Sequence, residues 1–272
     1  MTEKKPIQID IAKVLKDKAP NTKVPKFIVN ILRRIAHEDD FNDFFRKNPD
    51  VKNLEFMEAT FRYLEISVDV EGRENLPREG RSVFVSNHPL GGLDGVTISY
   101  ILSQTYGSNI RSISNDLLMN LEPLREMFVP VNKVGAQSKK LSSQMDELFA
   151  SDYQIMTFPA GVCSRKINGK VCDLEWKKSF VSKAIEHQRN VVPIYFDGKN
   201  SKFFYNLARL RKALGIKFNI EMMFLADEMF KQRGNHFRVV IGKPIPWQTF
   251  DKSKSPQKWA QWVKDIVYSM EK

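Results

Sequence analysis

Short apolar runs rich in β-branched residues alternate with longer segments of helical periodicity along most of the chain. This alternation is typical of a sheet whose strands are joined by helical crossovers. We therefore expect an α/β fold: a mixed, mainly parallel sheet flanked by helices, some antiparallel strands near its end, and an N-terminal helical appendage. The expected strands are residues 66–70, 82–85, 110–114, 127–133, 154–159, 191–196, 220–226 and 237–241. The expected helices are residues 9–16, 24–35, 39–47, 53–64, 94–105, 116–127, 138–150, 174–187, 203–214 and 256–270.

Charge and composition limit the kinds of partner. The 272 residues can bury a substantial core, and an excess of 43 Lys and Arg over 32 Asp and Glu gives a net charge of +11. Such a charge favours a polyanionic partner, either nucleic acid or an anionic bilayer. The sequence has no zinc-finger spacing, RNA-binding signature or helix-turn-helix pattern. We therefore expect a membrane lipid surface as partner and no nucleic acid.

The cysteine and histidine content bears on compartment and metal. Two cysteines, Cys163 and Cys172, are too few for a disulfide framework and indicate a reducing compartment. Four histidines give no spaced ligand set, so no metal is expected. No apolar run approaches the length of a membrane span, and the first residues lack the apolar core of a signal peptide. We expect a chain that does not span a membrane.

Residues 1–65 are expected to form a helical membrane-association segment ahead of an α/β domain at residues 66–272. Apolar residues recur at helical spacing from residue 24 to 35, with Lys26, Arg33 and Arg34 off that stripe. A basic amphipathic helix of this kind can lie in a lipid interface. The same stripe can equally cap the core of the domain, and both interpretations stay open at this point.

A strand-to-helix turn at residues 86–95 holds the strongest candidate for chemistry. It reads Ser-Asn-His-Pro-Leu-Gly-Gly-Leu-Asp-Gly and follows the apolar run at residues 82–85. Such a turn can fold Asp94 onto one imidazole nitrogen of His88, which fixes the tautomer and leaves the other nitrogen as a general base. The alternative is structural: Asp94 as a helix N-cap, glycines as turn residues and His88 as a packing residue.

Three further loops follow predicted strands: Lys133 ends one, residues 161–165 follow another and residues 197–200 follow a third. Ligands of open α/β sheets bind outside the carboxyl ends of the strands. These loops and the His88 turn are therefore expected to line one cleft. Each also has an ordinary explanation, because strand-end lysines and loop arginines are commonly solvated, and Asp and Asn are common turn residues.

Four blocks occur in a fixed order within residues 66–242. They are Asn87-His88 with Asp94, Phe128-Val129-Pro130-Val131-Asn132-Lys133, Phe158-Pro159-Ala160-Gly161 with Ser164-Arg165, and Val191-Val192-Pro193-Ile194. In this order the chain resembles the glycerolipid acyltransferase family, whose members acylate lysophosphatidic acid and related lysolipids. Two departures stand out: five residues rather than four separate His88 from Asp94, and Ala160 replaces the family's Glu, with Arg165 two positions later than the family's Arg. These forms resemble the hemolysin-like and ornithine-lipid acyltransferase branch.

The resemblance implies an O-acyltransferase that moves a fatty acyl chain from acyl carrier protein or coenzyme A to a lysolipid hydroxyl. The acceptor is either lysophosphatidic acid or an amino-acid lysolipid, the thioester is a substrate, and no cofactor is bound. His88 is the general base and Asp94 its orienting acid, with backbone N–H groups of Gly91 and Gly92 or of the following helix as oxyanion donors. The implied substrate-binding residues are Asn87, Gly91, Gly92, Lys133, Phe158, Pro159, Gly161, Ser164 and Arg165.

The implied location is the cytoplasmic face of the inner membrane, with peripheral or monotopic attachment. Two other functions remain open on the residues. A serine lipid hydrolase would use Ser86 or Ser164 with His88, although neither serine lies in a Gly-x-Ser-x-Gly elbow. A non-catalytic lipid-binding or hemolysin-like protein would act on membranes without chemistry.

Overall fold

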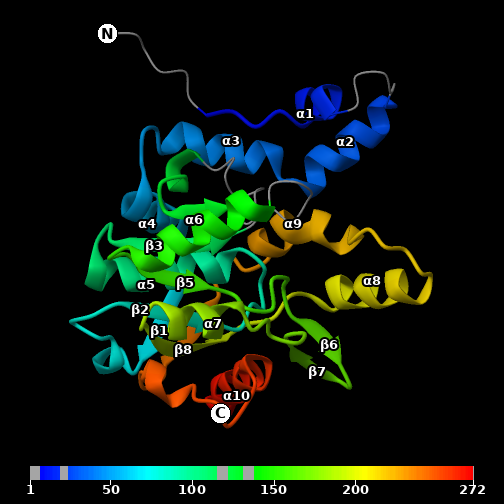
Figure 1. Cartoon of the computed structure of the whole chain (residues 1–272). Coiled ribbons are helices and arrows are strands. Elements are labelled where there is room, and N and C mark those ends of the chain that lie inside the picture. Colours follow the sequence, from blue (N-terminus) through cyan, green and yellow to red (C-terminus); the bar gives the residue numbers. More distant parts are fainter. Residues whose placement is uncertain (1–6, 19–23, 115–121, 131–137, 272) are drawn as a thin grey trace.

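The computed structural model describes residues 7–18, 24–114, 122–130 and 138–271 (Figure 1). Seven of the described strands form one sheet in the order β1-β9-β8-β2-β5-β3-β4. Their bounds are β1 Ser67–Glu71, β2 Ser82–Ser86, β3 Ile110–Ser114, β4 Phe128–Pro130, β5 Gln154–Thr157, β8 Asn190–Asp197 and β9 His236–Ile241. All neighbours pair parallel except β8 and β9, which are antiparallel. The expected α/β fold with a mainly parallel sheet is confirmed.

Strand β2 lies at the centre of this sheet, between β8 and β5. Val83 pairs with Val191 on one side and with Ile155 on the other. Every residue of β2 is buried, because helices cover both faces, and a strand covered on both faces is a continuous apolar run rather than an alternating one. The turn that carries His88 therefore begins at the end of the central, fully buried strand of the sheet.

Ten helices are described. Their bounds are α1 Ile11–Lys18, α2 Lys26–Ile35, α3 Glu38–Lys47, α4 Asn53–Leu64, α5 Leu93–Tyr106, α6 Ser138–Ala150, α7 Ser179–Glu186, α8 Lys202–Ala213, α9 Leu225–Phe230 and α10 Pro256–Ser269. Capping residues place two of the starts, since Ser201 and Ser255 each accept a hydrogen bond from a backbone N–H of the first turn.

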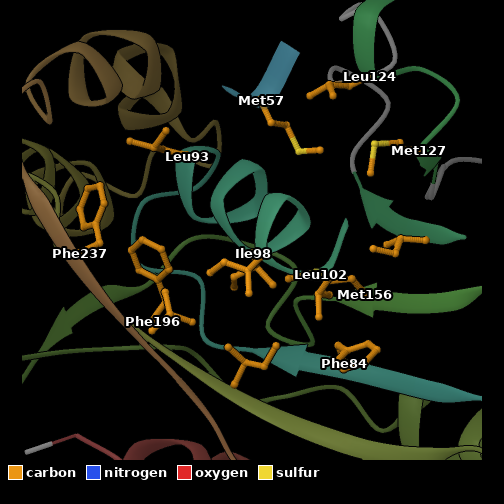
Figure 2. Packing of buried hydrophobic residues seen from close by; sticks show 14 of the residues in the cluster. Met57, Phe84, Leu93, Ile98, Leu102, Leu124, Met127, Met156, Phe196 and Phe237 are labelled. Carbon is orange, nitrogen blue, oxygen red and sulfur yellow. The ribbon is translucent and has the colours of Figure 1, made fainter. Parts of the chain in front are cut away.

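The core has one layer on each face of the sheet. On one face Phe84 packs with Met57 of α4 and Ile98 of α5, and Figure 2 shows Ile98 and Leu102 directed at the sheet beside Phe84 and Met156. On the other face Val83 and Val85 pack with side chains of α7 and α10. Successive β2 residues alternate between the two layers as strand geometry requires.

The N-terminal helices differ in how they use their apolar residues. Phe44 of α3 and Met57 of α4 belong to the same core as the sheet, so these helices cap the domain. Helix α2 has no buried residue, and Phe27 is 65% exposed. The stripe at residues 24–35 therefore does not cap the core, because no residue of α2 is buried, whereas α3 and α4, which lie outside that stripe, pack on the core. Its place in a lipid interface stays a prediction.

Three expected elements differ from the structure, and one further element was not expected. Residues 220–226 do not form a strand. They form a 3₁₀ turn, Ile220–Phe224, that runs into α9. In this turn Glu221 is fully buried and pairs with Arg165 and Arg211. Helix α7 begins at Ser179 rather than 174, because the preceding segment buries Trp176. The helix expected at 116–127 ends as a 3₁₀ turn, Glu122–Leu124, with its start outside the described residues. A hairpin of β6 (Arg165–Ile167) and β7 (Lys170–Cys172) was not expected.

Candidate active site

The carboxyl end of β2 delivers Asn87 and His88 to the edge of the sheet. The Asn87 side chain donates to the carbonyl oxygen of Phe196 on β8 at 2.9 Å and accepts from the N–H of Phe196 at 2.8 Å. Asn87 therefore continues the pairing of β2 with β8 past the end of the strand. It is buried, so it holds the loop in place rather than lining a surface open to substrate.

His88 and Asp94 form the expected pair. The Nδ1 atom of His88 lies 3.0 Å from an Asp94 carboxylate oxygen, and the ring stacks on Phe158 with centroids 3.9 Å apart. The Asp94 carboxylate is fully buried, whereas 16% of the His88 side chain is exposed. Within the described part of the chain, Nε2 makes no hydrogen bond, so the pair presents this nitrogen to a ligand.

Burial and charge act against each other in this pair. Burial by itself would lower the pKa of His88, but the charge and hydrogen bond of Asp94 outweigh it and raise the pKa above the ordinary value. Burial would likewise raise the pKa of Asp94, yet its bonds to His88 and to backbone N–H groups lower it. A charged carboxylate thus makes the imidazole a stronger base.

The turn itself is built around Asp94. One carboxylate oxygen accepts from the N–H groups of Leu90 and Gly91, and the other from those of Gly92 and Gly95. The N–H groups of Gly91 and Gly92 therefore both donate to Asp94, and the assignment of oxyanion donors to this turn or to the following helix stays a prediction. Gly91 has a φ of +77°, and a Cβ there would lie 3.0 Å from Cys163, so this backbone approach requires glycine.

The loop after β5 supplies the aromatic wall of the site. Phe158 follows the strand that pairs with β2 and stacks against His88, as its expected place in the cleft requires. Pro159 is buried behind it and accepts from the N–H of Lys177. Gly161 is exposed and turns the chain with a φ of +68°. The two loops after β2 and β5 thus meet at one edge of the sheet.

A buried carboxylate that sequence reasoning missed links these two loops. Asp173 accepts from the backbone N–H of His88 at 3.2 Å, from the hydroxyl of Ser164 at 2.5 Å and from the indole of Trp176 at 2.8 Å. Ser164 also donates its N–H to the His88 carbonyl oxygen. Ser164 is buried and bonds both Asp173 and the His88 turn, and its expected contact with substrate stays a prediction. An isolated acid in Val171-Cys172-Asp173-Leu174 was the available signal.

Arg165 lies at the base of the hairpin, beside the His88 turn. Its guanidinium donates to the Cys163 carbonyl oxygen and to Glu221 at 3.0 Å. Glu221 is fully buried and also accepts from Arg211 of α8 at 2.9 Å. Two guanidinium groups share one carboxylate, so this Arg165–Glu221–Arg211 trio keeps one net positive charge next to the site. Glu221 and Arg211 were not singled out from the sequence.

The remaining predicted residues have different outcomes. Lys133 lies outside the described residues. In the loop after β8, Gly198 approaches Leu90 of the His88 turn, so this loop adjoins the site as expected. Asn200 in that loop is buried, and neither polar atom of its amide has a partner in the described part of the chain.

Neither serine of the hydrolase alternative is arranged as a nucleophile. Ser86 donates to Asn87 and Ser164 donates to Asp173, and both are buried. Burial also raises the pKa of the Cys163 thiol to about 11, which keeps it protonated and unreactive at neutral pH. The geometry therefore favours transfer to an external nucleophile that His88 activates.

One group of potential metal ligands lies apart from this site. Asp146, Glu186 and His187 could converge on an ion, but the ammonium group of Lys183 already bonds both carboxylates. Since a protein cation holds this cluster together, we assign no metal site to it.

Replacing Asp173 with Asn tests its role in positioning His88. We expect kcat to fall about 10- to 100-fold, because small displacements of a catalytic group cost rates of this order, with KM little changed. The acid limb of the pH–rate profile should also move to lower pH, because the Asp173 charge helps to raise the pKa of His88. Trp176→Phe removes a different bond to Asp173 and serves as control. A normal pH limb in Asp173→Asn, with activity lost only through lower thermal stability, would reduce Asp173 to a structural residue.

Two named relatives match almost the whole chain in sequence, and one solved structure is similar to it in fold. A lyso-glycine lipid O-acyltransferase of Bacteroides thetaiotaomicron is 52% identical over 272 residues, which cover 99% of this chain and 100% of the relative. A protein of the same name from Phocaeicola vulgatus is also 52% identical, with 99% and 98% covered. The crystal structure of PlsC, a 1-acyl-sn-glycerophosphate acyltransferase of Thermotoga maritima, has a TM-score of 0.51 at 17% identity, covering 96% of this chain and 89% of that one.

The PlsC likeness supports the fold alone, whereas the family is established by the sequence comparisons. The family model described as Acyltransferase matches residues 13–272, nearly the whole chain. The pair of His88 and Asp94 lies within these matched residues. The chain therefore belongs to the acyltransferase family, and its resemblance to the glycerolipid acyltransferases is confirmed.

Proposed function

We propose that this enzyme transfers a fatty acyl group from a thioester to the hydroxyl of an amino-acid lysolipid of the lyso-glycine lipid type. The observation that carries the proposal is the hydrogen bond between Nδ1 of His88 and the buried Asp94 carboxylate just after the central strand, which leaves Nε2 of the partly exposed imidazole as the proton acceptor. The two relatives that match over their full lengths are both named for this acceptor. Of the two acceptors expected from the sequence, the amino-acid lysolipid is the one that these names favour.

The chemistry needs no protein nucleophile. The acceptor hydroxyl gives its proton to Nε2 of His88 as its oxygen bonds to the thioester carbonyl carbon. The tetrahedral oxyanion then collapses, the carbon–sulfur bond breaks, and the thiolate takes the proton from the imidazolium. Asp94 stays ionised throughout and stabilises the imidazolium, while its bonds to four backbone N–H groups keep it in place.

The charge near the site suits an anionic acceptor. The Arg165–Glu221–Arg211 trio has one net positive charge, and Arg165 follows directly on the loop whose Cys163 approaches Gly91 of the His88 turn. A glycine headgroup linked through its nitrogen ends in a carboxylate, and a guanidinium binds a carboxylate through charge-assisted hydrogen bonds. Lys133 remains a predicted contact to the acceptor.

The donor is proposed to be acyl carrier protein or coenzyme A carrying the acyl chain, and neither nucleic acid nor a bound cofactor is proposed. The enzyme is proposed to act peripherally at the cytoplasmic face of the inner membrane. None of the described helices is long and apolar enough to cross a bilayer, and a lysolipid acceptor resides in one leaflet.

The experiment is an acyl-transfer assay with purified protein and three acceptors: lyso-glycine lipid, its carboxamide analogue, which differs in one group, and lysophosphatidic acid. Lyso-glycine lipid should be acylated, and its uncharged carboxamide analogue should react with a kcat/KM about tenfold lower, because a charge-assisted hydrogen bond is replaced by a neutral one. Arg165→Gln should reduce this discrimination. Faster acylation of lysophosphatidic acid than of lyso-glycine lipid would overturn the proposed acceptor, and no acylation of either would overturn the proposed function.

A further inference from the structure

Exposed apolar side chains gather in one segment of the described chain. The described part of the chain has twelve exposed large hydrophobic residues, and six of them lie between residues 203 and 223. They are Phe203, Leu210, Leu214, Ile216, Phe218 and Met223. We call this segment, from α8 to the following 3₁₀ turn, the apolar ridge. Phe218 is 68% exposed and Leu214 is 65% exposed, which is unusual for such side chains unless something covers them.

The ridge is also basic, and its one acid, Glu221, is fully buried. Between residues 202 and 220 the sequence has five Lys and Arg and no Asp or Glu. Arg211 turns inward to Glu221, whereas Lys202, Arg209, Lys212 and Lys217 are exposed. Apolar side chains interleaved with cations match a surface that offers both acyl chains and phosphates.

Two other basic and apolar elements project from the same side of the molecule. Helix α2, with exposed Phe27 and Ile31, and the tip of the β6–β7 hairpin, with exposed Ile167, lie on the side that α8 occupies in Figure 1. The connection is direct, because His37, just after α2, bonds Asp227 of α9, and α9 continues from the ridge. The ridge and α2 are therefore parts of one side of the molecule.

We propose that the apolar ridge, together with α2, is the surface on which this enzyme rests on an anionic bilayer. The choice of a lipid occupant rests on the proposed function, since a lysolipid acceptor is a bilayer component. An acidic carrier protein would also attract the cations. It would not, however, explain several large apolar side chains that project singly from a helix and the loop after it, because isolated projecting side chains gain most by entering an acyl-chain phase.

The ridge is tied to the catalytic loop, so docking would bring the site to the lipid surface. The Arg165 guanidinium lies over the ring of Phe204 on the buried side of α8, 5.8 Å from its centroid. Leu225, directly after the ridge, lies within 3.0 Å of the Cβ position of Gly91. The elements that would contact lipid therefore pack directly against the turn that holds His88.

The test is flotation of the full chain with vesicles of phosphatidylcholine, with and without phosphatidylglycerol. A triple variant, Leu210→Ser, Leu214→Ser and Phe218→Ser, should bind both vesicle types about tenfold or more weakly, because three apolar side chains no longer enter the acyl region. Lys212→Gln with Lys217→Gln should weaken binding to the anionic vesicles alone, by about fivefold per lysine. Leu174→Ser removes an exposed leucine near α10, whose Lys264 bonds the Leu174 carbonyl oxygen, and should bind normally.

Activity with detergent-dispersed lysolipid separates this proposal from the proposed function. The ridge variants should keep wild-type activity there, because none of the changed residues touches the His88 turn. Unchanged flotation of the triple variant would overturn the ridge as a membrane surface. If the triple variant binds vesicles normally but no longer binds an acyl carrier protein, the ridge as a membrane surface is also overturned. A wild-type protein that floats but acylates no lysolipid would refute the proposed function and leave the ridge in place.

Discussion

His88→Ala should lower kcat for acyl transfer by about 10²- to 10⁴-fold, the range that general-base catalysis contributes. The imidazole is the group in the site that can take a proton from a neutral hydroxyl at pH 7, since Asp94 is buried and its pKa is lowered. The acyl-transfer assay, with a thioester donor and a lysolipid acceptor, measures this loss directly. Acceptor binding should change little, because the variant keeps the backbone of the turn.

The His88→Ala protein should remain folded, so a loss of activity can be assigned to the imidazole. Asp173 and Asp94 bond the loop through its backbone N–H groups, so alanine at residue 88 keeps most of the contacts that shape the turn. Far-ultraviolet circular dichroism and thermal unfolding should be close to wild type. Turnover within a few-fold of wild type in a folded His88→Ala protein would rule out the proposed base.

Asp94→Asn should have the second largest effect, a loss of about 10²-fold or more in kcat, because the imidazole loses its orienting and charge-stabilising partner. It should also change the pH dependence. Only neutral His88 can accept the hydroxyl proton, so activity falls as the pH drops through the pKa of His88, which Asp94 holds above its ordinary value. Without that charge, the acid limb of kcat/KM should move to lower pH.

The same substitution also weakens the turn. The buried carboxylate accepts from four backbone N–H groups, and the amide nitrogen of Asn would face some of these donors. We expect a cost of about 1–3 kcal/mol in the free energy of unfolding. An acid limb that stays in place in a folded Asp94→Asn protein would contradict the electrostatic coupling, whatever the loss of rate.

Local patterns made the central part of the site predictable. His88 and Asp94 are six residues apart within one strand-to-helix turn, so their contact depends on local backbone geometry. The buried strand before them was recognisable as a continuous apolar run. The missed hairpin had a local signal too, because Asn168-Gly169 separates its strands, both residues have positive φ, and Asn-Gly is the preferred sequence of a two-residue hairpin turn.

The sequence by itself therefore determined the mainly parallel α/β sheet, the acyltransferase family and the contact between His88 and Asp94. Tertiary structure decided what surrounds that pair. Asp173 reaches His88 across 85 positions of the chain, and Glu221 reaches Arg165 across 56. It also decided that Gly91 and Gly92 donate to Asp94 and that Ser164 is buried. The physical reason is that local geometry follows from neighbouring residues, whereas the partner of a buried polar group depends on how distant segments pack.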